Sequence, residues 1–442
     1  MAAWLARSGA SVRVADTRDS PPQLAALRRS LPGVSAVCGP FREETFAGVD
    51  LIAISPGVPL AEPRVQRALA AGTRVLGDIE LFAQSLIGKD ARVIAVTGTN
   101  GKTTVTSLAG SMARAAGADC EVAGNIGPAV LDALMRREDS RIYPDLWVLE
   151  LSSFQLESTA SLAADAATVL NISEDHLDRY SGIEEYAAAK ARIFAGDGVQ
   201  VLNRDDARSL AMALPGRSTI TFGLDAPRRE EDWGLLERGG EPWLAQGRSA
   251  LLAVREMKLA GLHNAANALA ALALCRALSL PLEPLVAALR QFKGLPHRVE
   301  PVGEAQGVRW YDDSKGTNVG STVAALAGLA QGGAKVVLIA GGEGKGQDFS
   351  PLGRAVARCA RALVLIGRDA PLIEAAVAGV DVPVLRANSM DQAVTLAGEA
   401  ARPGDAVLLS PACASFDMFR NYKHRGEVFR VAVERRLGAA QH

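Results

Sequence analysis

Short apolar runs alternate along the chain with longer stretches that are rich in alanine and leucine. The runs have the length and the valine and isoleucine content of buried strands, whereas the longer stretches show helical spacing. Repeated units of this kind are typical of an α/β fold built around parallel sheets. In the first part of the chain, strands are predicted at 11–16, 49–55 and 73–78, and helices at 23–31 and 63–72.

Two further segments repeat this pattern. A chain of 442 residues is longer than one ordinary hydrophobic core can serve, so three domains are expected. Their predicted ranges are 1–88, 89–297 and 298–442. The strands predicted in the second and third segments lie at 91–97, 146–153, 166–173, 199–203, 335–342, 360–367 and 406–412.

The charges of the chain nearly cancel, with 48 lysine and arginine residues against 49 aspartate and glutamate residues. This balance argues against nucleic acid as a partner and favours small molecules. No run approaches the roughly 18 apolar residues of a membrane span, and the first residues lack the features of a signal peptide. We therefore expect a cytoplasmic protein without membrane insertion. The five cysteines are widely scattered, which argues against a disulfide framework or a zinc site.

The N-terminal segment differs from a complete nucleotide-binding unit. Such a unit starts with a strand, a glycine turn and a helix, whereas residues 2–10 have the pattern of the helix itself. The first strand and its glycine loop have no counterpart, and we expect the natural protein to begin upstream of Met1. The alternative is a domain that simply starts with a helix.

The strongest chemical signal follows the predicted strand at 91–97. Glycines let backbone N–H groups approach a phosphate, and the N-terminus of the next helix favours negative charge. Lys102 can then reach the β- and γ-phosphates, and the Thr103 hydroxyl can ligate Mg²⁺. The strict motif has glycine where Val96 stands, so this is a variant loop, and it predicts nucleotide binding. Its residues are Gly98, Thr99, Asn100, Gly101, Lys102, Thr103 and Thr104.

Three later residues are candidates for a metal site. Glu150 ends an apolar predicted strand, at the sheet edge where α/β proteins bind ligands, although a helix cap or an ion pair would explain it too. His176 offers a neutral nitrogen ligand, although a lone histidine in such a segment is more often structural. Lys190 lies in a predicted helix, where a lysine is ordinarily solvated. Because an ammonium group repels a metal ion, only chemical modification would make Lys190 a ligand.

The order of these motifs resembles the Mur ligase family of ATP-dependent amide ligases. The resemblance is carried by TGTNGKTT, GNIG, LELSSFQLE, NISEDHLDRY, AAKARIF and GLHNAANALAA, and it extends over essentially all 442 residues. LELSSFQLE, GLPHRVE, DDSKGTN and SPACASFDMF are similar to the D-glutamate-adding type within that family. The resemblance implies an N-terminal Rossmann-like domain that is truncated, a central P-loop ATPase-like domain with a parallel sheet, and a C-terminal Rossmann-like domain.

The resemblance also assigns residues to ATP and to metal ions. It implies that Lys102 and Thr103 hold the ATP phosphates and a first Mg²⁺. It further implies that Glu150, His176 and a carbamylated Lys190 form a second Mg²⁺ site, because addition of CO₂ turns the ammonium group into an anionic oxygen ligand. The positions that match nucleotide contacts near the junction of the second and third domains are Asn264, Asn267, Arg298 and Asp313.

The remaining matched positions concern the other two substrates. A dicarboxylate such as D-glutamate needs a cation together with hydroxyl or N–H donors. The residues that resemble the family's D-glutamate contacts are Thr317, Lys345, Ser415 and Tyr422, with Lys315 as a further cation; the family usually has phenylalanine where Tyr422 stands. The residues that resemble its contacts to the UDP-linked substrate are Asp16, Thr17, Arg18, Gly57 and Asn125.

The resemblance implies that ATP is used to join D-glutamate to UDP-N-acetylmuramoyl-L-alanine through an acyl phosphate, in the synthesis of peptidoglycan precursors. We expect a monomer. Two alternatives stay open: a folylpolyglutamate synthase, which shares the family plan, and a nucleotide-binding regulatory module without catalysis. The DDSKGTN and SPACASFD motifs argue against the synthase. Lys102, Glu150, His176 and Lys190 argue against the regulatory module, since a protein that only binds ATP needs no second metal site.

Overall fold

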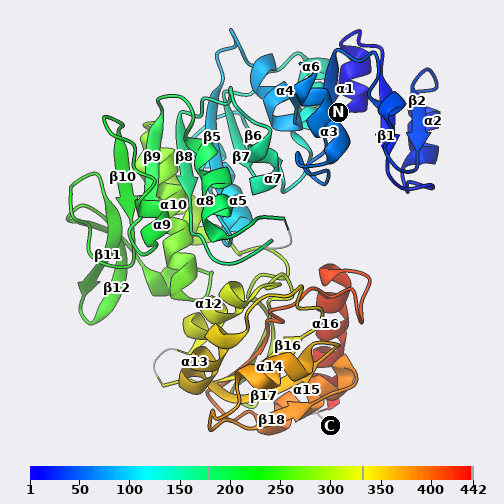
Figure 1. Ribbon diagram of the computed structural model, residues 1–442. Coiled ribbons are helices and arrows are strands. Elements are labelled where there is room, and N and C mark those ends of the chain that lie inside the picture. The colour runs from blue at the N-terminus through cyan, green and yellow to red at the C-terminus, as the bar shows by residue number, and fades with distance from the viewer. Residues whose placement is uncertain (177–178, 331–332, 440–442) are drawn as a thin grey trace.

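The computed structural model describes residues 1–176, 179–330 and 333–439. Within these ranges the strands form four sheets: two small two-stranded sheets near the N-terminus, one of nine strands and one of six strands. Figure 1 shows the nine-stranded and six-stranded sheets as separate bodies, one above the other, with the N-terminal strands β1 and β2 beside the upper body. The protein is an α/β protein of three domains, as predicted.

The N-terminal region has two parallel strand pairs, β1 with β2 and β3 with β4. The three predicted strands are present in shortened form, and β2 was not predicted because only four residues with exposed and half-buried side chains make it up. The elements are α1 (Ala2–Arg7), β1 (Arg13–Asp16), α2 (Leu24–Ser30), β2 (Ser35–Cys38), β3 (Leu51–Ala53), α3 (Pro63–Ala70), β4 (Arg74–Leu76) and α4 (Asp78–Ser85).

The central sheet has the order β13-β12-β11-β10-β9-β8-β5-β7-β6. Along this order, each strand from β6 to β11 pairs in parallel with the next, as predicted. Strand β12 then pairs antiparallel with β11, and β13 antiparallel with β12, an extension that was not predicted. The strands are β5 (Arg92–Thr97), β6 (Cys120–Gly124), β7 (Leu146–Glu150), β8 (Ala166–Val169), β9 (Val199–Asn203), β10 (Thr219–Phe222), β11 (Trp233–Arg238), β12 (Glu241–Gln246) and β13 (Ser249–Ala253).

Helices cover both faces of this sheet. Helices α5 and α10 share one core cluster with alternate residues of β5, whereas α4, α6 and α8 lie in the cluster on the other face. The helices are α5 (Lys102–Ala115), α6 (Val130–Ser140), α7 (Ser153–Glu157), α8 (Ile183–Ala191), α9 (Ala207–Leu210), α10 (Leu262–Ala277) and α11 (Leu282–Gln291). Because helices cover both faces of β5, the position of its last residue, Thr97, inside the sheet is fixed by packing.

The C-terminal sheet has the order β14-β15-β19-β16-β17-β18, with only β14 antiparallel to its neighbour. Strands β16, β17 and β19 were predicted, whereas β14, β15 and β18 were not. The elements are β14 (Glu300–Ala305), β15 (Val308–Asp312), α12 (Val319–Leu329), β16 (Val336–Gly341), α13 (Ser350–Cys359), β17 (Ala360–Ile366), α14 (Ala370–Ala376), β18 (Val384–Arg386), α15 (Met390–Ala400), β19 (Ala406–Leu409) and α16 (Tyr422–Ala439).

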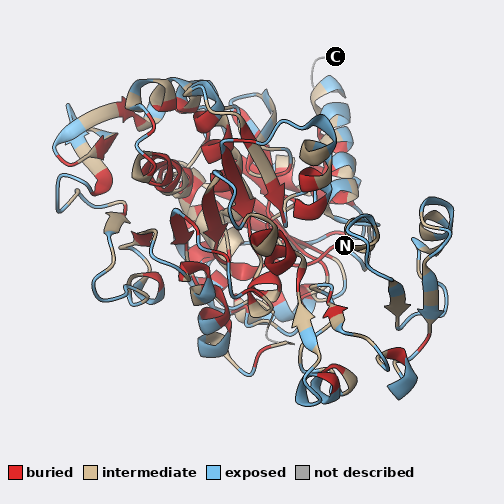
Figure 2. Ribbon diagram, turned by 90° about the horizontal axis from the view of Figure 1, so that it is seen from above, coloured by how far each residue is buried: buried red, intermediate tan, exposed pale blue. Residues whose placement is uncertain are grey.

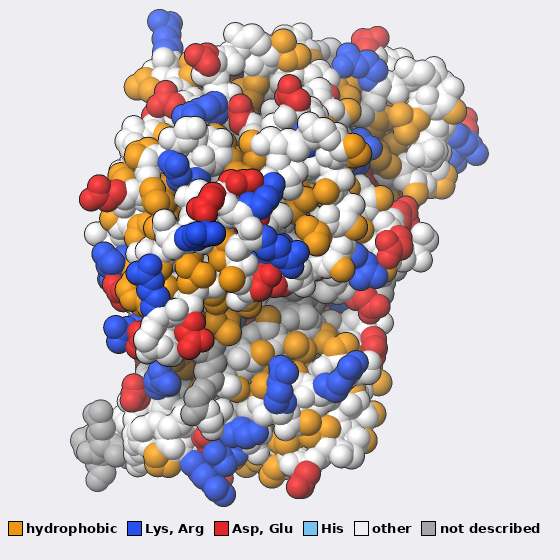
Figure 3. All heavy atoms as spheres, turned by 90° about the vertical axis from the view of Figure 1, so that its left-hand side faces the viewer, with side chains coloured by type: hydrophobic (Ala, Val, Ile, Leu, Met, Phe, Trp, Pro, Cys, Tyr) orange, Lys and Arg blue, Asp and Glu red, His pale blue; other side chains and the backbone are white. Residues whose placement is uncertain are grey.

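Burial is concentrated in the two large sheets. Figure 2 shows buried segments at the centre of the molecule, while the outlying N-terminal strands are mostly half-buried or exposed. On the face shown in Figure 3, basic and acidic side chains are interspersed, in agreement with the balanced charge of the chain. None of the helices in the described ranges combines the length and the hydropathy that crossing a membrane requires.

Candidate active site

The phosphate-binding loop lies between β5 and α5, as the sequence predicts. Gly98 has a φ of 147°, and a Cβ there would lie 2.9 Å from the Cβ of Leu170. Gly101 has a φ of 85°, and its Cβ would lie 2.5 Å from Oδ1 of Asn267. Both glycines are therefore required by the backbone conformation and by close approach, since L side chains rarely adopt such φ values.

Two lysines direct their ammonium groups at this loop. Lys102 Nζ donates to the carbonyl oxygens of Gly98 at 2.8 Å and Thr99 at 2.9 Å. Lys190, from α8, donates to the same Gly98 oxygen at 3.0 Å. Burial lowers the pKa of both lysines, and the nearby charge of Lys102 lowers the pKa of Lys190 further. Lys190, predicted from the residues alone to be a solvated lysine, is only 1% exposed.

Glu150 ends β7, the neighbour of β5, and is 2% exposed. Its Oε1 accepts a hydrogen bond of 2.7 Å from Nδ2 of Asn125, while Oε2 is buried without a protein partner in the described residues. Asn125 also donates its backbone N–H to the carbonyl of Glu150. A buried carboxylate oxygen without a donor is costly unless a cation or ligand satisfies it.

His176 lies in the loop after β8, and this loop is tied to the phosphate-binding loop. Thr99 Oγ1 donates to the carbonyl of Ser173 at 3.1 Å, and the Ser173 backbone N–H donates to Thr99 Oγ1 at 3.0 Å. His176 has a φ of 56°, and its ring centroid lies 4.8 Å from that of Phe154. Non-glycine residues with positive φ are uncommon and occur preferentially at functional sites.

The segment that joins the second and third domains brings Arg298 to the phosphate-binding loop. Arg298 Nη2 donates to Thr103 Oγ1 at 2.7 Å, across 195 residues of sequence. Its neighbours His297 and Val299 have φ values of 62° and 47°, an unusual conformation for a β-branched residue such as Val299. Asp312 accepts a hydrogen bond of 2.7 Å from the His297 ring, which anchors this turn.

Asp313 lies beside Arg298 at the end of β15. Its carboxylate accepts from Ser410 Oγ at 2.7 Å and from the Val299 backbone N–H at 3.3 Å. Burial raises the pKa of Asp313 to about 7, although these hydrogen bonds and Arg298 act in the opposite direction. On α10, Asn267 donates to Asn264, which donates to the Ala260 carbonyl.

The residues matched to D-glutamate all belong to the third domain, three of them in loops and one at the start of a helix. Thr317 precedes α12, Lys345 follows β16 in a loop where its φ is 53°, Ser415 follows β19 and Tyr422 begins α16. Lys315 Nζ lies 4.4 Å from the centroid of the Tyr422 ring, which brings two of the motifs together. Burial lowers the pKa of Lys315 to about 8, and Arg298 and Lys102 lower it further.

Arg425, on α16, hydrogen-bonds to both the DDSKGTN and the SPACASFDMF segments, and it was not predicted as a site residue. It is fully buried, and it donates to Ser314 Oγ and to the carbonyls of Ser314, Cys413 and Ala414, at 2.8 to 3.3 Å. Burial lowers its pKa to about 10. A buried guanidinium that bonds only to backbone and hydroxyl oxygens is rare, and no signal in the sequence separates Arg425 from the many exposed arginines of the chain.

The residues matched to the UDP-linked substrate are spread over two regions. Asp16 is the last residue of β1, and Arg18 donates hydrogen bonds of 2.6 to 3.0 Å to its carboxylate. These bonds lower the pKa of Asp16 to about 2. Thr17 lies between them, and Gly57 lies in the turn after β3. Figure 1 shows β1 at the outer edge of the molecule, away from α5. Of these five residues, Asn125 alone hydrogen-bonds to a candidate residue of the metal site, Glu150, among the described hydrogen bonds.

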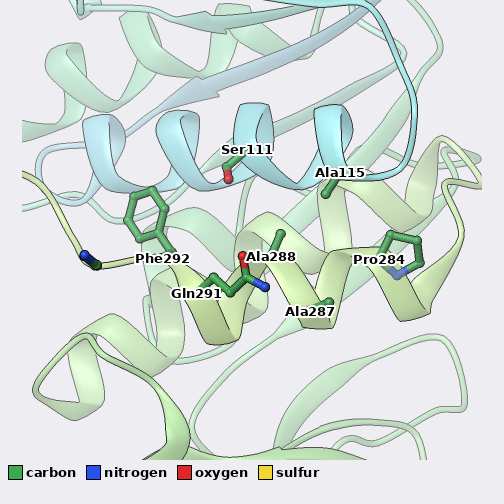
Figure 4. A pocket seen from close by; sticks show the side chains of 8 residues that line it. Ser111, Ala115, Pro284, Ala287, Ala288, Gln291 and Phe292 are labelled. Carbon is green, nitrogen blue, oxygen red and sulfur yellow. The ribbon is translucent and has the colours of Figure 1, made fainter.

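A groove between α5 and α11 is separate from this site. Figure 4 shows its lining side chains between the two helices, and none of them is a predicted site residue. The groove lies along the later turns of α5, whereas Lys102 and Thr103 belong to the first turn of that helix. Its lining residues are Ser111, Ala115, Pro284, Ala287, Ala288, Gln291, Phe292 and Lys293.

Comparisons with known proteins agree on one family. Three family models match: the Mur ligase MurD-like N-terminal domain at 1–77, the Mur ligase middle domain at 96–275, and the Mur ligase glutamate ligase domain at 297–413. The chain is 59% identical to UDP-N-acetylmuramoylalanine--D-glutamate ligase of Nitrosomonas europaea, covering 98% of this chain and 93% of that protein. It is 58% identical to the enzyme of the same name from Nitrosospira multiformis, covering 100% and 93%.

Solved structures show the same fold at low sequence identity. MurF from Acinetobacter baumannii has a TM-score of 0.64 at 20% identity and covers 95% of this chain and 90% of that one. UDP-N-acetylmuramate-alanine ligase MurC from Thermotoga maritima has a TM-score of 0.60 at 19% identity, covering 99% and 96%. Together with the family models and the close relatives, these similarities establish that the chain belongs to the Mur ligase family.

Proposed function

We propose that this protein uses ATP to join D-glutamate to UDP-N-acetylmuramoyl-L-alanine in the synthesis of peptidoglycan precursors. The observation that carries the proposal is that relatives named for this ligation are 52% to 59% identical over nearly the whole chain. The geometry agrees, because Lys102, Lys190 and Arg298 converge on one phosphate-binding loop. The folylpolyglutamate synthase of Mycobacterium tuberculosis, at 19% identity, shares the fold alone.

The loop and its surroundings fit an ATP–Mg²⁺ complex. The first turn of α5 offers backbone N–H groups, Lys102 offers a cation, and the Thr103 hydroxyl is within reach of the same region. Within the described residues, Glu150 Oε2 is a buried carboxylate oxygen without a hydrogen-bond donor, as expected of a metal ligand. We propose that Thr103 holds one Mg²⁺, and that Glu150, His176 and Lys190 hold another. Bound Mg²⁺ would neutralise phosphate charge.

Lys190 meets a chemical requirement for carbamylation. Only a neutral amine attacks CO₂, and burial together with Lys102 holds the pKa of Lys190 well below its ordinary value. Attack forms a nitrogen–carbon bond and releases one proton, which leaves a carbamate anion. That anion would be attracted by Lys102 instead of repelled, and it would offer the oxygen ligand that Mg²⁺ prefers.

The reaction then needs two steps in one place. First, the γ-phosphoryl group of ATP passes to the carboxylate of the L-alanyl substrate, giving ADP and an acyl phosphate, while Lys102 and Arg298 stabilise the transferred charge. Next, the neutral amine of D-glutamate attacks the acyl carbon, and the tetrahedral intermediate loses phosphate and a proton to give the amide. Thr317, Lys345, Ser415 and Tyr422 would hold D-glutamate for this attack.

The assignment of domains follows from the same proposal. Residues 1–88 would bind the UDP end through Asp16, Thr17, Arg18 and Gly57, residues 89–297 would bind ATP, and residues 298–442 would bind D-glutamate. Asn264, Asn267 and Asp313 would complete the nucleotide site between the second and third domains. We further propose that the enzyme works as a cytoplasmic monomer, which light scattering at micromolar concentration and cell fractionation would test.

A phosphate-release assay with the purified chain tests the proposed function. Phosphate is measured with ATP, Mg²⁺ and UDP-N-acetylmuramoyl-L-alanine, in the presence of D-glutamate, L-glutamate or no amino acid. We expect release that depends on D-glutamate, together with an equal amount of amide product. Release with L-glutamate alone would contradict the substrate assignment, and ATP binding without any release would favour a regulatory module.

A further inference from the structure

An amide pair connects the phosphate-binding loop to the third domain. Asn318 Nδ2 donates to Asn100 Oδ1 at 3.1 Å, and Asn100 Nδ2 donates to Asn318 Oδ1 at 3.4 Å, across 218 residues of sequence. Asn318 is 6% exposed. Its Nδ2 also lies 3.4 Å from Oδ2 of Asp175, in the loop that carries His176. One side chain of the third domain therefore contacts two loops of the candidate ATP and metal site.

Asn318 has a second, local role as the N-cap of α12. Its Oδ1 accepts a hydrogen bond of 2.8 Å from the Ser321 backbone N–H. The first turn of α12 packs closely on the central domain, because a Cβ on Gly320 would lie 3.0 Å from Ser173 Oγ and 3.3 Å from Asn100 Nδ2. The cap and the amide pair thus use the same side chain, and different substitutions can separate them.

Asn100 is held firmly on its own side of the contact. Its backbone N–H donates to Asn171 Oδ1 at 2.8 Å, and Asn171 Nδ2 donates to the Asn100 carbonyl at 3.1 Å. The Asn318 amide therefore meets a fixed acceptor. Because Thr317 immediately precedes Asn318, any movement of this contact moves a residue that we assign to D-glutamate.

We propose that Asn318 is a positioning residue that fixes the D-glutamate site against the phosphate-binding loop, so that the amine reaches the acyl phosphate before water does. This inference rests on the proposed function. Loss of the amide pair would leave phosphoryl transfer possible, since that step uses residues of the central domain and Arg298. The acyl phosphate would then wait for a misplaced amine and would hydrolyse in part.

Two substitutions separate the positioning role from the helix cap. Serine and aspartate are both good N-caps, so Asn318→Ser and Asn318→Asp each preserve the start of α12. Both remove the amide N–H donors, and Asn318→Asp adds a carboxylate next to Asp175. Ser389 caps α15 of the same domain in the same way and has no contact with the central domain among its described hydrogen bonds, so Ser389→Ala is the control for a lost cap.

The measurement is the ratio of phosphate released to amide formed, together with the KM for D-glutamate and the Kd for an ATP analogue. We expect a ratio of one for the wild-type chain and the control. We expect a higher ratio and a KM for D-glutamate raised at least about fivefold in Asn318→Ser, since one neutral hydrogen bond alone accounts for that factor and the amide pair contains two, with a larger change in Asn318→Asp. The Kd for the ATP analogue should stay within about twofold, because the phosphate contacts are retained.

The outcomes are distinguishable. A ratio of one in both variants, or an Asn318→Asp variant that matches the wild type, would show that Asn318 is only a cap and would overturn the inference while leaving the ligase intact. A wild-type chain that forms no amide would overturn the proposed function and this inference with it.

Discussion

Lys102 and Lys190 donate hydrogen bonds to the same carbonyl oxygen, that of Gly98, at 2.8 and 3.0 Å. Two ammonium groups so close together disfavour each other's charge, and burial adds to the effect. The pair is therefore better suited to one cation and one neutral or anionic group than to two cations. Carbamylation of Lys190 would produce that state.

The first prediction concerns Lys190. We expect Lys190→Ala to lose activity by at least about 100-fold, since loss of outer-shell partners alone commonly costs 10- to 100-fold. Short carboxylic acids such as acetate should restore part of the activity, because they supply an oxygen ligand in the space left by the side chain. Phosphate release at increasing acetate concentration measures the rescue.

A matched control for this experiment is Lys335→Ala, which removes a half-buried lysine of the third domain that donates to the Arg358 carbonyl. It should keep full activity and show no response to acetate. Full activity of Lys190→Ala without acetate would contradict the carbamate, and so would a mass spectrum of the native protein without the added CO₂ under conditions that preserve carbamates.

A second prediction concerns the contact between Arg298 and Thr103. Lysine in place of Arg298 keeps the charge but loses the planar group that reaches the Thr103 hydroxyl. We expect Arg298→Lys to raise the KM for ATP about tenfold, which corresponds to about 1.4 kcal/mol. Arg309→Lys, at an exposed arginine of β15, is the control and should leave the KM unchanged. An unchanged KM in Arg298→Lys would place Arg298 outside the nucleotide site.

A third prediction follows from the raised pKa of Asp313, which is about 7 in the folded chain against 3.8 for an ordinary aspartate. Between these values the folded chain binds more protons at this group than the unfolded chain does. Stability contributed by protonated Asp313 is therefore present below pH 4 and is lost as the pH rises through 7. Asp313→Asn removes this dependence, so its stability relative to the wild type should increase from pH 5 to pH 7.5.

The urea concentration at the midpoint of unfolding, measured across this pH range, tests the third prediction. Asp405→Asn serves as the contrasting variant, because Arg361 and the backbone lower the pKa of Asp405. Because the pKa of Asp405 lies below this pH range in both the folded and the unfolded chain, the stability of Asp405→Asn relative to the wild type should stay constant from pH 5 to pH 7.5. A pH-independent difference between wild type and Asp313→Asn would show that Asp313 is ionised throughout.

A fourth prediction concerns Arg425. The lysine ammonium group cannot reach all three carbonyls and the Ser314 hydroxyl that accept from Arg425, so Arg425→Lys leaves buried acceptors without donors. We expect a loss of about 3 kcal/mol in the unfolding free energy of the third domain. Arg430→Lys on the same helix changes a partly exposed ion pair and should cost less than about 1 kcal/mol. Equal effects of the two substitutions in urea unfolding would contradict the structural role.

The sequence predicts those parts of the fold in which one physical signal dominates. Strands β5, β7 and β16 are buried on both faces, so their uninterrupted apolar runs identify them. The glycine-rich loop after β5 is equally clear, because both of its glycines have positive φ. Strands β14 and β18 have mostly half-buried and exposed side chains, and their pattern does not distinguish them from loops.

Contacts between distant segments were beyond prediction for a different reason. Asn318 belongs to the DDSKGTN motif, but its pairing with Asn100 depends on how two domains meet. Arg425 has the residue type of a surface cation and yet is fully buried. The roles of the predicted site residues stay predictions until the experiments above are done, although the structure brings Lys102, Glu150, Lys190 and Arg298 into one region.

Helix α10 has a consequence for the synthesis of the protein on the ribosome. It shares the core cluster of α5, from which it is separated by almost 150 residues, and its Asn267 closes over Gly101. The part of α5 that packs on α10 therefore stays uncovered until residue 277 has left the exit tunnel, and the contact of Asn267 with Gly101 forms only then. The growing chain therefore completes its nucleotide site late, and the uncovered apolar face of α5 is an aggregation hazard during that interval.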